Sequence, residues 1–285
     1  MEHKMAENTN PLAKFFRQPA IYVRLPSEGK GWEPDSIVMP NNNELPILPM
    51  TAIDEITYRT PDALFNGEAV TSVIKSCCPN IKNPWAVPGT DLDVLLVAIR
   101  IASYGHEMDI ETRCPACTEE HEFGLDLRTI IDNLKASNFD KPFVKGDLTF
   151  HFKPLNYREM NVNSMLQFEQ QRNLEAVTRD TSVPEADRVT KLNGMMRQLI
   201  TVTLKALSQS ISEIRTNDSI VAEQEHIEEF LGNCDRGLFT TLRDHIIELR
   251  ANSELKPLEI KCPSCQHEYK QLFTLDMANF FVAAS

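Results

Sequence analysis

Two Cys-Pro-x-Cys turns, at Cys114–Cys117 and Cys262–Cys265, constrain the folding of this 285-residue chain more than any other feature. In such a turn, called a knuckle below, two thiolates point toward one metal ion. Structural zinc takes four ligands in a tetrahedron, and two knuckles supply four sulfurs. We therefore predict one shared, zinc-ribbon-like site that holds one structural Zn²⁺ per chain, with the ligands Cys114, Cys117, Cys262 and Cys265.

A shared site ties together distant parts of the chain, because 144 residues lie between Cys117 and Cys262. The ion would fasten the C-terminal segment to the first half, and closing so long a loop removes much entropy from the unfolded chain. Four thiolates and one Zn²⁺ carry a net negative charge. Arg113 and Lys261 stand directly before the first cysteine of each pair, so we expect them to offset part of this charge.

Similar residues follow the two knuckles: His121-Glu122-Phe123 in one and His267-Glu268-Tyr269 in the other. Either histidine could replace a sulfur, but we interpret both as surface residues of their knuckles. The remaining three of the seven cysteines lie in or beside helical segments and are interpreted as ordinary, partly buried thiols: Cys77, Cys78 and Cys234.

Two other uses of the cysteine pairs stay open. Thioredoxin-like redox chemistry would explain one Cys-x-x-Cys, but not two similar ones with proline after the first cysteine. Catalytic zinc keeps an open position for water and uses histidine or carboxylate ligands, and the chain has no His-Glu-x-x-His motif. In a reducing compartment the pattern favours metal or redox chemistry over structural disulfides.

Composition and charge disfavour several other classes of protein. The 41 acidic and 29 basic residues give a net charge of −12, which disfavours a grip on a phosphate backbone. The most apolar stretches, residues 94–99 and 199–204, are far shorter than the roughly 20 residues of a membrane-spanning helix. The segment over residues 1–16 has no apolar h-region, so we expect no signal peptide and a cytosolic chain.

Catalytic motifs are absent from the sequence: it has no Gly-x-Gly-x-x-Gly, phosphate loop or Gly-x-Ser-x-Gly. We interpret the carboxylates at Asp54–Glu55, Asp91–Asp93 and Glu107–Glu111 as acidic surface, and predict no enzymatic activity and no small-molecule substrate. A zinc-ribbon protein that binds nucleic acid or acts in transcription is the alternative. Neither knuckle, however, is surrounded by interleaved basic and aromatic residues.

Hydrophobic periodicity predicts an α+β fold. Residues 1–14 are polar and patternless and are predicted to form a flexible arm, and residues 15–155 are predicted to form a half of mixed helices and strands that carries the first knuckle. We expect Asn41–Glu44 to be the tip of a hairpin, and Thr90 or Asp91 to cap the helix that ends before Gly105. The expected strands of this half span residues 37–39, 45–50 and 147–152. We expect two short helices that begin at Thr51 and Pro61, and three further helices over residues 69–76, 92–103 and 127–134.

The second half changes to a mainly helical texture over residues 156–257. Helices are predicted over residues 157–178, 185–214, 219–231 and 235–251. In the longest, an apolar stripe at steps of three and four must be buried against something: Leu192, Met195, Met196, Leu199, Ile200, Leu204, Leu207 and Ile211. Residues 258–285 return to strand, carry the second knuckle and are predicted to pack back on the first half.

Three passages of the first half resemble a known family: LPSEGKGW at residues 25–32, LPMTAIDE at 48–55 and LLVAIRIASYGHEMDIETRCPAC at 95–117. They are similar to the baseplate proteins of T4-like contractile-tailed phages, whose members are associated with the baseplate hub and its assembly. The resemblance covers residues 25–127, and the second half matches only through the returning knuckle.

This resemblance implies a structural or assembly protein of the hub region, located in the virion or, during assembly, in the host cytoplasm. Its partners would be other baseplate or hub proteins, and no catalytic residues or membrane contact are implied. An acidic, zinc-stapled chain with long amphipathic helices suits such a scaffold. The helices over residues 157–178 and 185–214 are the best candidate interaction surfaces.

Overall fold

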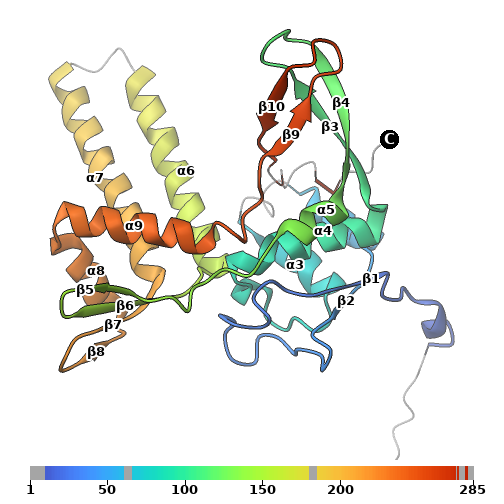
Figure 1. Cartoon of the computed structure of the whole chain (residues 1–285), viewed down its shortest axis with the longest axis horizontal. Helices are drawn as coiled ribbons and strands as arrows, with labels where there is room; N and C mark the ends of the chain where they lie inside the picture. The colour runs from blue at the N-terminus through green and yellow to red at the C-terminus, as the bar shows by residue number, and fades with distance from the viewer. Residues whose placement is uncertain (1–9, 61–65, 180–184, 274, 276–279, 282–285) are drawn as a thin grey trace, which may run out of the picture.

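A computed structural model describes residues 10–60, 66–179, 185–273, 275 and 280–281, and these form a mixed α+β protein (Figure 1). The helices of this part are η1 (Ala13–Phe15), α1 (Ala52–Tyr58), α3 (Glu68–Cys77), η2 (Pro84–Ala86), α4 (Gly89–Tyr104), α5 (Leu127–Asn133), α6 (Tyr157–Arg179), α7 (Glu185–Gln209), α8 (Gln224–Asn233) and α9 (Arg236–Arg250). Among the described helices, none has the length and apolar character needed to cross a membrane.

Small antiparallel sheets make up the β structure. The strands are β1 (Ile21–Val23), β2 (Leu45–Ile47), β3 (Glu107–Arg113), β4 (Glu120–Asp126), β5 (Phe143–Lys145), β6 (Leu148–Phe152), β7 (Ile211–Arg215), β8 (Ile220–Val221), β9 (Leu258–Lys261) and β10 (Glu268–Gln271). One sheet has four strands in the order β5-β6-β7-β8, and the other described sheets are two-stranded.

The described residues form two hydrophobic cores. The first surrounds α4, whose residues 94–99 are fully buried, and takes side chains from β1, β2, α3 and α5. It also takes Phe273, Phe280 and Phe281, so residues from the C-terminal end pack on the first half. The second core lies between the four-stranded sheet and helices α7, α8 and α9.

Most predicted helices are confirmed to within a few residues, because their apolar faces are continuous: α3, α4, α5, α6 and α9. Thr51 caps α1 as predicted, since its hydroxyl accepts from Asp54 N at 3.2 Å while Asp54 accepts from Thr51 N at 2.7 Å. The helix start predicted at Pro61 lies outside the described residues.

The predicted hairpin between residues 37–39 and 45–50 is wrong. Strand β2 pairs instead with β1, with Ile21 opposite Ile47, and Ile37 forms an isolated bridge with Ile81. Alternating apolar residues indicate that a segment suits a sheet, but they carry no information on which strand it pairs with.

The strand expected over residues 147–152 exists as β6, but it does not close the first half. It pairs with β7, and its Phe150 and Phe152 are buried in the second core. The partner strand β7 comes from the region predicted as mainly helical, so the sheet joins segments from both sides of the expected boundary at residue 155.

The helix predicted over residues 185–214 ends earlier, at Gln209, and Ile211 begins strand β7. Spacing of three, as between Ile211 and Ile214, also fits a strand with an irregular register, which β6 and β7 have. Among the stripe residues whose burial the structure describes, Leu207 and Ile211 near the end are buried, whereas Ile200 is 60% exposed. The helix predicted over residues 219–231 likewise divides into β8 and α8.

The carboxylate of Asp91 is fully buried, and it neither caps α4 nor lies on an acidic surface. It accepts hydrogen bonds from Ser27 N at 2.9 Å, from Ser27 Oγ, and from Trp32 Nε1 at 2.8 Å. Burial raises the pKa of Asp91, and the bonds from Ser27 and Trp32 counteract part of this rise. Asp91 therefore fastens the segment over residues 25–32 to the start of α4.

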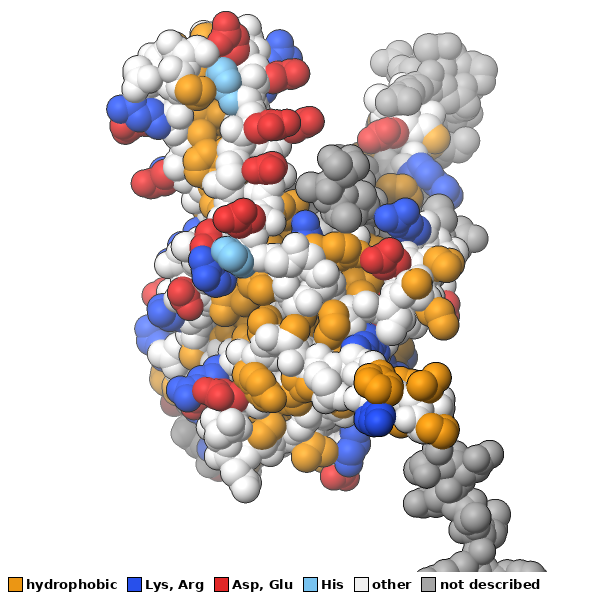
Figure 2. All heavy atoms as spheres, turned by 90° about the vertical axis from the view of Figure 1, so that its right-hand side faces the viewer, with side chains coloured by type: hydrophobic (Ala, Val, Ile, Leu, Met, Phe, Trp, Pro, Cys, Tyr) orange, Lys and Arg blue, Asp and Glu red, His pale blue; other side chains and the backbone are white. Residues whose placement is uncertain are grey.

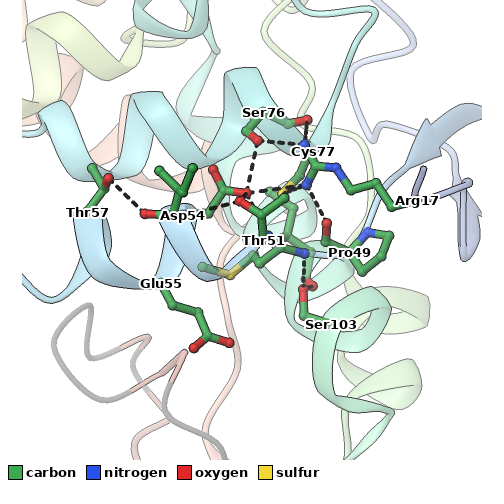
Figure 3. Close-up of polar contacts among 12 residues, drawn as sticks. Arg17, Pro49, Thr51, Asp54, Glu55, Thr57, Ser76, Cys77 and Ser103 are labelled. Atoms are coloured by element: carbon green, nitrogen blue, oxygen red, sulfur yellow. Dashed lines mark hydrogen bonds and ion pairs between the residues drawn. The ribbon is translucent and has the colours of Figure 1, made fainter. Parts of the chain in front are cut away.

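A second buried acid, Asp54, anchors the N-terminal segment (Figure 3). Arg17 Nη1 lies 3.3 Å from Asp54 Oδ2 and donates to Pro49 O, and its Nη2 donates to Ser76 O at 2.8 Å and to Ser76 Oγ at 2.6 Å. Asp54 is thus an internal ion-pair partner instead of acidic surface. In the chain, η1 precedes Arg17, and apolar side chains in and beside it are exposed, as the hydrophobic side chains near the N-terminal end in Figure 2 illustrate: Leu12, Phe15 and Phe16.

Candidate metal centre

Two antiparallel hairpins, β3–β4 and β9–β10, project together from the body and end at the two knuckles (Figure 1). In the first, Cys114 N donates to Glu119 O at 3.0 Å and Thr118 N donates to Cys114 O at 2.9 Å. In the second, Cys262 N donates to His267 O and Gln266 N to Cys262 O, both at 2.9 Å. The two knuckles therefore share one backbone conformation.

Thr118 and Gln266 occupy the same place in this conformation, each with a φ of 61°. That left-handed backbone is uncommon for residues other than glycine, so its occurrence at both equivalent places marks a specific turn. Sequence reasoning missed this feature, because neither residue type signals a positive φ.

The backbone hydrogen bonds show that the residues after the two knuckles correspond differently from the sequence comparison, which paired His121 with His267 and was two positions out of register. Glu119 corresponds to His267, because each accepts from the first cysteine, and His121 corresponds to Tyr269. The similar triplets after the two knuckles are therefore not equivalent in space. His121 and His267 have different surroundings for this reason.

The structure brings the four predicted sulfurs together, all within 4.8 Å of one another. Cys114 Sγ lies 3.7 Å from Cys265 Sγ, and Cys117 Sγ lies 3.6 Å from Cys262 Sγ. These separations are too long for a disulfide, and all four are free thiols. A tetrahedral zinc with Zn–S bonds of about 2.3 Å requires sulfurs about 3.8 Å apart. The donor set and its spacing thus fit zinc.

The ionisation of the sulfurs is uneven. The backbone N–H of Cys117 lowers the pKa of Cys114 to about 6. Cys117 accepts from the backbone N–H of Glu119, which lowers its pKa, but burial and the neighbouring sulfurs outweigh this bond and raise the pKa to about 12. Close thiols resist forming several anions unless a cation is present, and a coordinating metal ion supplies that cation.

The two basic residues beside the cysteines have partners of their own. Arg113 Nε donates to Thr118 O at 3.1 Å, and Lys261 Nζ lies 4.0 Å from Glu268 Oε1. Both are exposed, so their effect on the charge of the sulfur cluster acts through space instead of through contact. The offset of charge expected from them stays a prediction.

Two side chains cross between the hairpins, and neither contact was predicted. Thr112 Oγ1 lies 2.9 Å from Tyr269 Oη, and His121 Nε2 lies 3.3 Å from Cys262 Sγ. His121 is half-buried beside the sulfurs, whereas His267 is exposed as expected. A pattern within one knuckle cannot reveal such contacts, because they depend on how the second hairpin is placed.

Acidic side chains cover the exposed face of β3–β4, in the upper projecting part of the molecule in Figure 2. Glu111 stands directly opposite Glu122, and neighbouring exposed acids extend the row: Glu107, Asp109 and Glu120. The expectation of acidic surface is therefore confirmed for residues 107–111. Such a face repels a phosphate backbone, which disfavours the nucleic-acid alternative.

The remaining cysteines are distant from this cluster. Cys77 and Cys78 are fully buried in the first core instead of partly buried, and burial raises the pKa of Cys77 to about 12. Cys234 is half-buried beside α8, as expected. None of these three joins a group of possible metal ligands among the described residues.

The family described as "T4 bacteriophage base plate protein" matches residues 51–282. This stretch includes both knuckles, the second hydrophobic core and the first core apart from its residues before position 51, such as those of β1 and β2. The match extends through the helical second half, further than the resemblance noted in the sequence, while residues 25–32 precede it. These features place the chain among the structural proteins of a phage tail baseplate. It belongs to the T4 bacteriophage base plate protein family. No curated protein and no solved structure matches it.

Proposed function

We propose that this protein is a structural or assembly component of the hub region in the baseplate of a contractile phage tail, without catalytic activity. Membership of the baseplate family is the observation that carries this proposal. It would act through contacts with other baseplate or hub proteins, in the virion or in the host cytoplasm during assembly.

We infer that one Zn²⁺ per chain, bound by the four cysteine sulfurs, stabilises the fold. The support is the sulfur spacing together with the identical knuckle backbones. Four sulfurs would complete the tetrahedron and leave no open position for water or substrate, which favours a structural ion over a catalytic one.

The helical hairpin α6–α7 is the best candidate contact surface. It projects from the body in Figure 1, and Val162 and Ile200 expose 41% and 60% of their surface. The exposed apolar side chains of η1 are a second candidate, because contiguous apolar surface on a folded protein marks contact sites.

Native mass spectrometry of the protein from infected cells tests both parts of the proposal. One zinc per chain with attached tail proteins is the expected result, whereas bound nucleic acid without tail proteins would contradict the baseplate role. A chain that ends at Pro257 should lose its zinc and unfold more easily than the full chain. Full zinc retention by this truncated chain would contradict a site shared by the two knuckles.

A further inference from the structure

One difference between the two knuckles bears directly on the sulfur cluster. His121 and Tyr269 occupy corresponding places on β4 and β10, and each crosses to the opposite hairpin. Tyr269 meets the hydroxyl of Thr112, but His121 places Nε2 3.3 Å from Cys262 Sγ. Of these two residues, only the histidine is a type that commonly ligates zinc, so it places a nitrogen donor at the edge of the cluster. The exposed carboxylate of Glu119 also lies within 4.8 Å of Cys117 Sγ, but it has no hydrogen-bond contact with a cysteine sulfur among those of the described residues.

The His121 ring lies beside one edge of the sulfur cluster. Cys117 and Cys262, 3.6 Å apart, form this edge, and a ring nitrogen of His121 also lies within 4.8 Å of Cys117 Sγ. Cys114 and Cys265 form another edge, and Cys265 is exposed. The His121 ring therefore makes its hydrogen-bond contact with Cys262, and Cys265 Sγ has its 3.7 Å contact with Cys114 Sγ on another edge.

The chemistry of the pair depends on whether sulfur 262 is present. An imidazole with its proton on Nε2 donates to the Cys262 thiolate and orients that ligand. Without the sulfur, Nε2 could turn toward the metal and coordinate it as in three-cysteine, one-histidine sites. The proton of the neutral ring then resides on Nδ1.

We propose that His121 is a reserve ligand of this site, which hydrogen-bonds to Cys262 in the intact protein and takes over its coordination position when that sulfur is lost. The inference rests on the zinc site proposed above. It implies that the site tolerates loss of Cys262 better than loss of Cys265.

Two pairs of full-length variants test this role with zinc alone as the probe. Cys262→Ala should hold one zinc with three sulfurs and one nitrogen in X-ray absorption, and adding His121→Ala should replace the nitrogen by oxygen. Cys265→Ala is the matched control and should show no histidine nitrogen. In chelator competition, His121→Ala should lower zinc affinity by at least about tenfold more in the Cys262→Ala background than in the control.

Equal effects of His121→Ala in the two backgrounds, or no nitrogen in Cys262→Ala, would overturn the proposal. If Cys262→Ala does not fold, ¹⁵N-histidine NMR of the intact zinc protein provides the second measurement. It should find the proton of His121 on Nε2, and an unprotonated Nε2 would overturn the proposal. A wild-type chain that binds no zinc through four sulfurs would instead contradict the proposed function.

Discussion

Replacing Asp91 by alanine removes the acceptor that joins the segment over residues 25–32 to α4. Three donors would lose their partner: Ser27 N, Ser27 Oγ and Trp32 Nε1. Asp91 is fully buried and Trp32 is half-buried, so water cannot freely replace the carboxylate. We therefore expect Asp91→Ala to lower the free energy of unfolding substantially.

The expected size follows from these contacts. Hydrogen bonds to a charged group contribute about 1.5 to 3 kcal/mol each, so three bonds set a gross loss of several kcal/mol. Part of this gross loss is offset, because the mutation also removes the unfavourable burial of the carboxylate, which the raised pKa of Asp91 indicates. The net loss should be about 3 to 5 kcal/mol, a large share of the stability of an ordinary domain.

Urea unfolding, followed by tryptophan fluorescence and by circular dichroism, measures this loss. Trp32→Phe removes a single bond and should cost about 1 to 2 kcal/mol in the wild-type protein. In the Asp91→Ala background the same change should cost much less, because its partner is already gone. A loss below about 1 kcal/mol for Asp91→Ala, or fully additive effects, would refute the assigned role of Asp91.

Three further changes test other parts of the fold. Burial, together with the charge of Glu254, raises the pKa of Asp93 from 3.8 to about 6, so ionisation of Asp93 destabilises the fold increasingly as the pH rises from 4 to 6. In urea unfolding, Asp93→Asn should therefore stabilise the protein by up to about 3 kcal/mol at pH 8 and by little at pH 4. Arg17→Met leaves the buried Asp54 without its ion-pair partner and should cost about 1 to 3 kcal/mol, whereas Arg24→Met, at an exposed pair with Glu44, should change the unfolding midpoint little. Phe281→Ala leaves a cavity beside Tyr58, since the two ring centroids are 4.6 Å apart, and should lower the free energy of unfolding by about 3 to 5 kcal/mol. An unchanged midpoint of thermal unfolding would mean that Phe281 does not stabilise the first core.

Local features of the sequence were sufficient to predict much of the fold and of the candidate site. The knuckles are short turns whose four cysteines are set by spacing, and the structure brings these four sulfurs together. Helices such as α3, α6 and α9 follow from apolar periodicity, and the cap of α1 follows from Thr51 and Asp54 within one turn. The helices, the cap and each knuckle depend on residues close together in the chain, whereas the meeting of the two knuckles was predicted from the four ligands that structural zinc takes.

Features that depend on distant residues were predicted poorly. The burial of Asp91 depends on Ser27 and Trp32, more than 50 residues earlier, and the contact of His121 depends on Cys262, 141 positions later. The end of α7 depends on β6, which offers Ile211 and Ile214 a place in a sheet. An acidic or apolar residue has the same local pattern whether such a partner exists or not.

By itself, the sequence determined most of the helices and both knuckles, because backbone preference and apolar spacing act over a few residues. The preference of structural zinc for four ligands then predicted which four sulfurs meet. Only the tertiary structure decided that β2 pairs with β1, that His121 corresponds to Tyr269, and that Asp54 and Asp91 lie inside. These outcomes arise because burial and hydrogen-bond partners are supplied by whichever distant segment packs alongside, and that choice belongs to the assembled fold.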